Sequence, residues 1–143
     1  MEYPLNDGNS LKTKPKNKIV TYYEECDNAY RDAWGMDKNM QLNLGLWFKG
    51  TKNLSEALFN LNTELAKKLN ITMDDYILDA GCGVGGTAIH FAKTFGCKVV
   101  GITLTPHQVE KANINAKKEK VDHLVSFFEM DYIFLNKLLS KNF

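Results

Sequence analysis

The chain has 143 residues, of which 44% are hydrophobic and 24% charged, a length that suits one compact domain and excludes two full ones. Eighteen Lys and Arg oppose seventeen Asp and Glu, so the net charge of +1 gives no general field for attracting nucleic acid or an anionic membrane. The apolar runs are far shorter than the roughly 20 residues that cross a bilayer, and the start lacks the apolar stretch of a signal peptide. We expect a cytoplasmic protein without nucleic-acid binding or integral membrane association.

Cysteine and histidine usage also excludes some classes of site. The three cysteines form no CxxC pair, and the three histidines are scattered without an HExxH pattern. An odd number of unpaired cysteines indicates neither a disulfide framework nor a thiolate metal site. We therefore expect a reducing compartment and no metal.

The N-terminal part of the chain is expected to be helical after a mobile arm. Residues 1–15 are polar and contain two prolines and alternating lysines, which is typical of a solvated tail. Apolar residues then recur at steps of three and four from Ile19 to Trp34, which predicts one amphipathic helix ended by Gly35. A second helix is expected from Asn53, with Glu56 three residues on, to Asn70. We expect the apolar segment 40–50 to pack over another part of the protein.

From Tyr76 onward, strands alternate with helices. The strands are expected at 76–79, 97–104 and 124–131, with one helix ending near Phe95 and another beginning at Pro106. Thr105 and Gln108 are spaced as a capping box for the second helix. This βαβαβ order predicts a parallel sheet.

Four glycines lie within six residues, directly after the first strand and before a helix: Gly81, Gly83, Gly85 and Gly86. Glycine there lets the backbone turn tightly and lets a ligand approach the main chain beside a helix N-terminus. A GxGxxG string alone is weak evidence. Between a strand and a helix that open a βαβ unit, it indicates an adenosine-containing ligand.

The flanking residues separate two classes of ligand. A dinucleotide site expects an Asp or Glu about 20 residues after the loop, to hold the ribose. The stretch 96–109 contains no acidic residue, whereas Asp79 ends the first strand. A carboxylate that faces the loop suits a cation such as a sulfonium and repels a pyrophosphate, so an NAD-type half-domain is disfavoured.

Three blocks of sequence resemble the class I S-adenosylmethionine-dependent methyltransferases. They are LDAGCGVG at 78–85, VVGITLTPHQ at 99–108, and the upstream pieces AWG at 33–35 and NLGLW at 43–47. The chain is most similar to the group that contains sterol and tocopherol C-methyltransferases, small-amine N-methyltransferases and cyclopropane fatty acid synthases. In that group a Thr-Leu-Ser/Thr run and a following Gln often stand where other methyltransferases have an acid. The match runs from about Tyr22 to Tyr132.

The resemblance implies an α/β, Rossmann-like class I methyltransferase fold. Residues 16–70 would form helices that act as a lid, and residues 71–143 the first βαβαβ half of the cofactor-binding domain. The family's sheet has seven strands in the order 3-2-1-4-5-7-6, and only strands 1 to 3 are present here. Residues 133–143 would begin the next crossover helix, and the first strand would become an edge that pairs with the missing half or with another copy.

The resemblance also implies a site for S-adenosylmethionine, with S-adenosylhomocysteine as product. Gly81 and Gly83 would lie against the methionine part, with Asp79 shaping that end. The remaining implied contacts are Thr103, Leu104 and Gln108 along the ribose and adenine, Asp131 and Tyr132 at the adenine, and Tyr22, Leu42 and Asn43 from the lid. No catalytic base is implied, and the methyl acceptor is a small molecule whose identity stays open.

Three of these residues have an alternative interpretation. Gln108 is equally expected to close the capping box with Thr105. The carboxylate of Asp79 could instead accept from N–H groups at the start of the following helix. Tyr22 lies on the apolar stripe, where core packing is at least as expected as a ligand contact. The activity also has an alternative, because a fragment could bind the cofactor without transferring a methyl group.

Overall fold

The computed structural model describes residues 14–135, in which helices precede and alternate with three strands. In chain order the elements are α1 (Lys14–Glu25), α2 (Asp27–Trp34), α3 (Met36–Asn39), α4 (Leu54–Leu69), β1 (Tyr76–Ala80), α5 (Gly86–Phe95), β2 (Lys98–Thr103), α6 (Pro106–Lys118), β3 (Val125–Glu129) and the short 3-10 helix η1 (Tyr132–Phe134). The predicted βαβαβ unit is thus confirmed. Residues 1–13 of the predicted arm and 136–143 of the predicted crossover helix lie outside the described residues.

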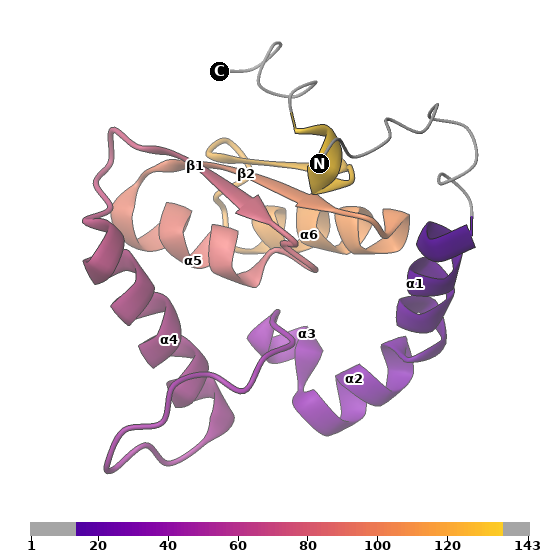
Figure 1. Ribbon diagram of the computed structural model, residues 1–143. Coiled ribbons are helices and arrows are strands. Elements are labelled where there is room, and N and C mark those ends of the chain that lie inside the picture. Colours follow the sequence, from indigo (N-terminus) through magenta and orange to yellow (C-terminus); the bar gives the residue numbers. More distant parts are fainter. Residues whose placement is uncertain (1–13, 136–143) are drawn as a thin grey trace, which may run out of the picture.

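The three strands form one parallel sheet in the order β1-β2-β3. Helices α5 and α6 lie together on one face of the sheet (Figure 1), and their apolar sides enclose the main core with Val99 and Phe127. On the other face Val100 and Ile102 are buried with Leu78. Among the described strands, β1 lies at one edge of the sheet. The C-terminal end of β1 lies next to the segment that precedes α4.

Helix α4 begins and ends where the sequence predicts. The Asn53 side chain accepts a hydrogen bond of 3.0 Å from the Glu56 N–H, and the Glu56 carboxylate accepts one of 2.9 Å from the Lys52 N–H. The first bond satisfies an N–H group that a helix start leaves without an intrahelical partner, and the second ties the residue before the cap to the first turn. At the other end Asn70 takes the left-handed conformation with φ +52°. The local signals therefore fix both ends of this helix.

The predicted single helix from Ile19 to Trp34 is wrong in one respect, because the structure divides it into α1 and α2 at Cys26. The first residue of α2, Asp27, contacts side chains of α6. The spacing of apolar residues cannot predict such a long-range contact. Helix α1 also begins earlier than expected, at Lys14, inside the segment predicted as an arm. Gly35 ends α2 in the left-handed conformation, as predicted.

The predicted capping box of α6 is also wrong. Pro106 does occupy the first turn, but the Thr105 side chain makes no cap hydrogen bond. The Gln108 side chain instead accepts a hydrogen bond of 2.7 Å from the buried Thr103 hydroxyl. A buried hydroxyl without a partner is costly, so this bond outweighs the cap.

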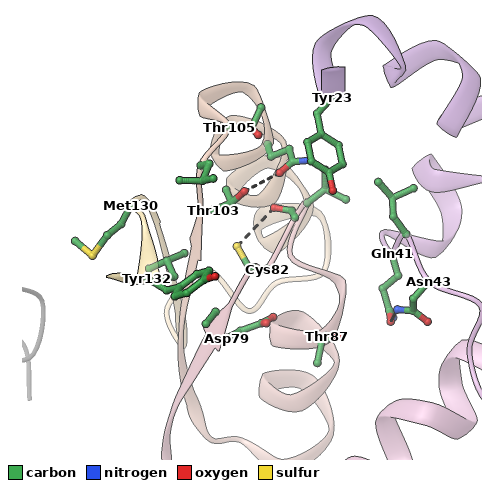
Figure 2. Close-up of a pocket in the computed structure, with 18 of the residues that line it drawn as sticks. Tyr23, Gln41, Asn43, Asp79, Cys82, Thr87, Thr103, Thr105, Met130 and Tyr132 are labelled. Atoms are coloured by element: carbon green, nitrogen blue, oxygen red, sulfur yellow. Dashed lines mark hydrogen bonds between the residues drawn. The ribbon is translucent and has the colours of Figure 1, made fainter. Parts of the chain in front are cut away.

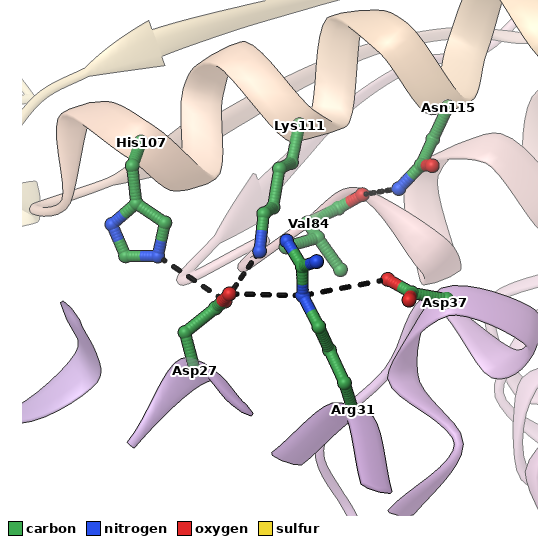
Figure 3. Close-up of polar contacts among 7 residues, drawn as sticks. All are labelled: Asp27, Arg31, Asp37, Val84, His107, Lys111 and Asn115. Atoms are coloured by element: carbon green, nitrogen blue, oxygen red, sulfur yellow. Dashed lines mark hydrogen bonds and ion pairs between the residues drawn. The ribbon is translucent and has the colours of Figure 1, made fainter. Parts of the chain in front are cut away.

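A cluster of charges joins the N-terminal helices to α6 (Figure 3). The Asp27 carboxylate accepts a hydrogen bond from Lys111, lies 2.9 Å from Arg31 Nε and lies 3.6 Å from His107 Nε2. Burial alone would raise the pKa of Asp27, but the hydrogen bond and charge of Lys111, with Arg31 and His107, bring that pKa below its usual value. The cluster therefore holds α2 on the body of the domain.

We expect Asp27→Asn to lower the thermal midpoint at neutral pH and to leave it nearly unchanged in acid. Because the folded pKa of Asp27 lies below its unfolded value, the stabilisation is present above that unfolded value and is lost as the pH falls through the folded pKa. A double-mutant cycle with Lys111→Met, followed by denaturant unfolding, should give a coupling energy of at least about 0.5 kcal/mol. Asp32→Asn on the exposed side of α2 is the control. A coupling energy near zero would contradict the proposed link.

Candidate functional site

A cleft of about 440 Å³ opens at the C-terminal ends of β1 and β2 (Figure 2). Its floor is the loop from β1 to α5, in which Gly81, Gly83 and Gly85 have φ of +98°, +54° and +89°. These left-handed conformations favour glycine, and they bring the main chain to the surface of the cleft. The loop is fixed to β2, because the N–H groups of Gly81 and Cys82 both donate to the Ile102 carbonyl. The volume falls in the range of small-molecule and cofactor sites.

Asp79 gives the cleft its charge. Among the described residues that line the cleft, it is the only one with a formally charged side chain. Burial raises the pKa of its carboxyl, and the backbone N–H of Ala88 in the first turn of α5 opposes that rise. Its second oxygen, Oδ2, is buried and has no hydrogen-bond partner within residues 14–135. A buried carboxylate oxygen without a partner beside an open cleft is suited to a cationic ligand group.

The neighbouring thiol adds no reactivity. Cys82 is buried, and burial, together with the charge of Asp79, raises its pKa to about 12. At neutral pH the group is therefore a thiol and not a nucleophilic thiolate. It donates a weak hydrogen bond of 3.6 Å to the Gly83 carbonyl and serves as part of the floor.

The ends of β2 and β3 form one side of the cleft. Thr103 and Gln108 are both buried and joined by their 2.7 Å hydrogen bond, which fixes the orientation of the glutamine amide. Leu104 and Thr105 continue this side, and Met130 and Tyr132 approach from the end of β3. No acidic residue stands at the end of β2, where a dinucleotide site places its ribose-binding carboxylate.

The opposite side of the cleft comes from the chain before α4. Met40, Gln41, Leu42 and Asn43 form a wall across from the glycine loop, and Ile19 and Tyr23 of α1 also line the cleft. Figure 2 shows Gln41 and Asn43 lying together on this wall, joined by a hydrogen bond of 3.3 Å. The first four residues of the segment 40–50 thus pack over the site as expected, whereas Leu44, Trp47 and Phe48 are more than half exposed.

The structure brings nine of the eleven predicted site residues to this one cleft: Leu42, Asn43, Asp79, Gly81, Gly83, Thr103, Leu104, Gln108 and Tyr132. Tyr22 and Asp131 do not line it. Tyr22 is 53% exposed and shares a hydrogen bond with the Tyr30 hydroxyl, so it is neither a core residue nor a wall of the cleft. Asp131 accepts a hydrogen bond from the Ile133 N–H and caps η1.

Four polar residues of the cleft were not predicted as site residues, and one of them, Thr105, was expected only as a helix cap. Tyr23 takes the place expected for Tyr22, because consecutive helical residues point about 100° apart and the docking of α1 decides which one faces inward. Gln41 lies in a segment without periodicity, so nothing in the sequence marks it. Thr87 lies in the first turn of α5. Its position directly after the glycine loop is the sequence signal that could have identified it as a site residue.

Comparison with known proteins identifies the family. The sequence model of the family described as mycolic acid cyclopropane synthetase matches residues 10–141. The chain belongs to this family. It is 33% identical over 113 residues to a sterol 24-C-methyltransferase of Kluyveromyces lactis, and 36% identical over 116 residues to the 27-O-demethylrifamycin SV methyltransferase of Amycolatopsis mediterranei. The resemblance to the N-terminal part of a class I S-adenosylmethionine-dependent methyltransferase is thereby confirmed.

The matches cover most of this chain and a smaller part of each relative. They include 79% and 80% of the chain but only 29% and 41% of these two relatives. Among solved structures, the cyclase SpnF is similar with a TM-score of 0.74 and 23% identity, over 82% of this chain and 43% of that one. The geranyl diphosphate C-methyltransferase of Streptomyces coelicolor A3(2) is similar with a TM-score of 0.58 and 21% identity, over 83% and 50%. These likenesses confirm the Rossmann-like fold of this family member.

Proposed function

We propose that this chain binds S-adenosylmethionine in the cleft and is the N-terminal part of a methyltransferase that acts on a small-molecule acceptor. One observation carries the proposal. Asp79, the only formally charged side chain among the described residues lining the cleft, has a buried oxygen that finds no hydrogen-bond partner among those residues. A cationic adenosine compound matches this arrangement, whereas a pyrophosphate would be repelled.

The two ends of the cleft suit the two ends of that cofactor. Asp79 and the backbones of Gly81 and Gly83 would hold the amino-acid end, where an ammonium group meets the carboxylate. Thr103, Leu104 and Gln108 would lie along the ribose and adenine, with the Tyr132 ring beside the adenine. Leu42 and Asn43 would close the cleft over the sulfur. Neither Tyr22 nor Asp131 belongs to the proposed contact set, because neither lines the cleft.

The reaction that fits is an in-line displacement. A nucleophilic carbon, nitrogen or oxygen of the acceptor attacks the methyl carbon while the carbon–sulfur bond breaks and its electron pair passes to sulfur. The residues of this chain contribute by fixing the sulfonium against the loop and by excluding water with the wall from Met40 to Asn43. No catalytic base is assigned among the described residues.

The position of β1 at an edge of the sheet affects which partners we expect for this chain and whether we expect it to methylate an acceptor. Because an edge strand offers its backbone groups to a further strand, we expect β1 to pair with a further part of a longer polypeptide or with a second copy of this chain. The 143 residues alone are then expected to bind the cofactor without methylating an acceptor. A binding module that never catalyses is the alternative, and turnover by a longer form of the protein would exclude it. A cytoplasmic location stays a prediction.

Calorimetric titration of the chain with S-adenosylhomocysteine tests the proposal, with NADH as the comparison ligand and the mass in solution measured in parallel. Binding of S-adenosylhomocysteine but not NADH is the expected result. Binding of NADH alone would overturn the proposal in favour of a dinucleotide site. Absence of binding to either ligand from a monodisperse, folded protein would also contradict it.

A further inference from the structure

Gly86 is in direct contact with a segment 45 residues earlier in the chain. Its N–H donates a hydrogen bond of 3.0 Å to the Met40 carbonyl. A Cβ at this position would lie 2.3 Å from that carbonyl oxygen and 2.4 Å from Gln41 Cγ. Carbon atoms cannot approach so closely, so only glycine admits this contact.

The backbone conformation does not explain the glycine. Gly86 is the first residue of α5 and is absent from the glycines with positive φ, unlike Gly81, Gly83 and Gly85. In a helix, alanine is ordinarily more stable than glycine. The close approach of Met40 is therefore the physical reason for glycine at position 86.

The segment that Gly86 holds is the wall of the cleft, and its other end is held in the same way. A Cβ at Gly45 would lie 2.4 Å from the Ala57 carbonyl carbon, and the Leu46 N–H donates a 2.7 Å hydrogen bond to the Ala57 carbonyl. Between these two points the Asn43 side chain bonds the Gly45 N–H and the Gln41 side chain. The wall is thus attached to α5 at one end and to α4 at the other.

The wall contributes two amide side chains of its own to the cleft, those of Gln41 and Asn43. In Figure 2 Gln41 and Asn43 lie across the cleft from Met130 and Tyr132, and Asp79 and Thr87 lie between the two sides. A zwitterionic amino acid needs a carboxylate for its ammonium group and amide donors for its own carboxylate. Asp79 supplies the first, and the amides of Gln41 and Asn43 can supply the second.

We propose that Gly86 is a positioning residue that fixes the Met40–Asn43 wall, and that Gln41 on this wall binds the amino-acid end of the ligand. The inference rests on the proposed function, because it assigns one end of the cleft to the methionine part of S-adenosylmethionine. Gly86 itself acts through the wall. The adenosine end, at Thr103 and Gln108, does not depend on it.

Gly86→Ala separates these two ends of the site. We expect the variant to bind S-adenosylhomocysteine roughly tenfold more weakly, the effect of one or two lost hydrogen bonds, and to bind adenosine as the unmodified chain does. Its thermal midpoint should fall by more than that of Thr94→Ala, an exposed control on the same helix, because the new Cβ displaces the Met40 backbone, so the selective loss of one ligand is the readout that decides. Both affinities are measured by calorimetry on the whole chain.

The outcomes distinguish this inference from the proposed function. If the unmodified chain fails to bind S-adenosylhomocysteine, the proposed function is wrong and not merely the role of Gly86. If it binds and Gly86→Ala binds equally well, or loses adenosine to the same extent, the positioning role is overturned. Should Gly86→Ala fail to fold, Gln41→Ala leaves the Met40 hydrogen bond in place and should show the same selective loss. Unchanged affinity in Gln41→Ala would overturn the inference.

Discussion

Asp79→Asn should weaken the binding of S-adenosylhomocysteine by at least about 30-fold at neutral pH. The substitution keeps the size and shape of the side chain and removes the only formal charge among the described residues lining the cleft. Removing one partner of a buried, hydrogen-bonded charge pair costs about 2 kcal/mol or more, which corresponds to this factor. Calorimetric titration measures it, and Asp74→Asn, a carboxylate just before the opposite end of β1, is the control.

The pH dependence of the same site gives a second readout of this prediction. Because burial raises the folded pKa of Asp79 above its unfolded value, its contribution to the stability of the ligand-free protein is greatest below the unfolded value and is lost as the pH rises through the folded pKa. An ammonium group binds the ionised carboxylate, so affinity for the ligand should rise across that same interval. Asp79→Asn should show no such rise. Equal affinity and equal pH dependence in both proteins would show that the carboxylate does not meet the ligand.

Local signals account for the parts of the fold that the sequence predicts. Helix α4 begins at Asn53 because a side-chain cap and Glu56 stand at the required spacing, and it ends at Asn70 because asparagine tolerates the left-handed conformation. The three strands follow from short apolar runs between helical patterns. The glycine loop is predictable because three of its glycines have conformations that other residues rarely adopt.

Two errors about the helices occur at residues whose side-chain partners the local pattern does not indicate. The first helix divides at Cys26, and the next residue, Asp27, contacts Lys111, 84 residues later. Gln108 leaves its expected capping role because the buried hydroxyl of Thr103 needs an acceptor. Neither partner is visible in the local pattern, and hydrophobic periodicity carries no information about either contact.

The sequence likewise predicts one part of the candidate site and not the other. Its floor comes from one continuous motif, so residues such as Asp79 and Gly81 could be located from the sequence. Its wall comes from a non-periodic segment that meets the start of α5 through the contacts of Met40 and Gln41 with Gly86. Gln41 therefore escaped prediction, and so did the choice of Tyr23 over Tyr22.

We expect the largest loss of stability when the side chain that packs beneath the glycine loop is removed. Phe127 of β3 is only 6% exposed, and its ring lies directly against two glycines. A Cβ at Gly85 would come within 2.8 Å of this ring, and a Cβ at Gly101 within 2.5 Å. The missing side chains of these two glycines create the space that the ring fills, which joins β2, β3 and the loop into one packed unit.

Phe127→Ala should lower the free energy of unfolding by about 3 to 5 kcal/mol, since it combines lost burial with a cavity beneath the loop. Phe128→Ala is the matched control, because the neighbouring residue of the same strand points to the other face and is 40% exposed. Urea unfolding compares the two, and the control should lose much less. Equal losses would mean that general strand content, and not the ring under the loop, sets the stability. A selective loss in Phe127→Ala, with weaker binding of S-adenosylhomocysteine in the fraction that stays folded, would show that the core of the sheet also shapes the cofactor loop.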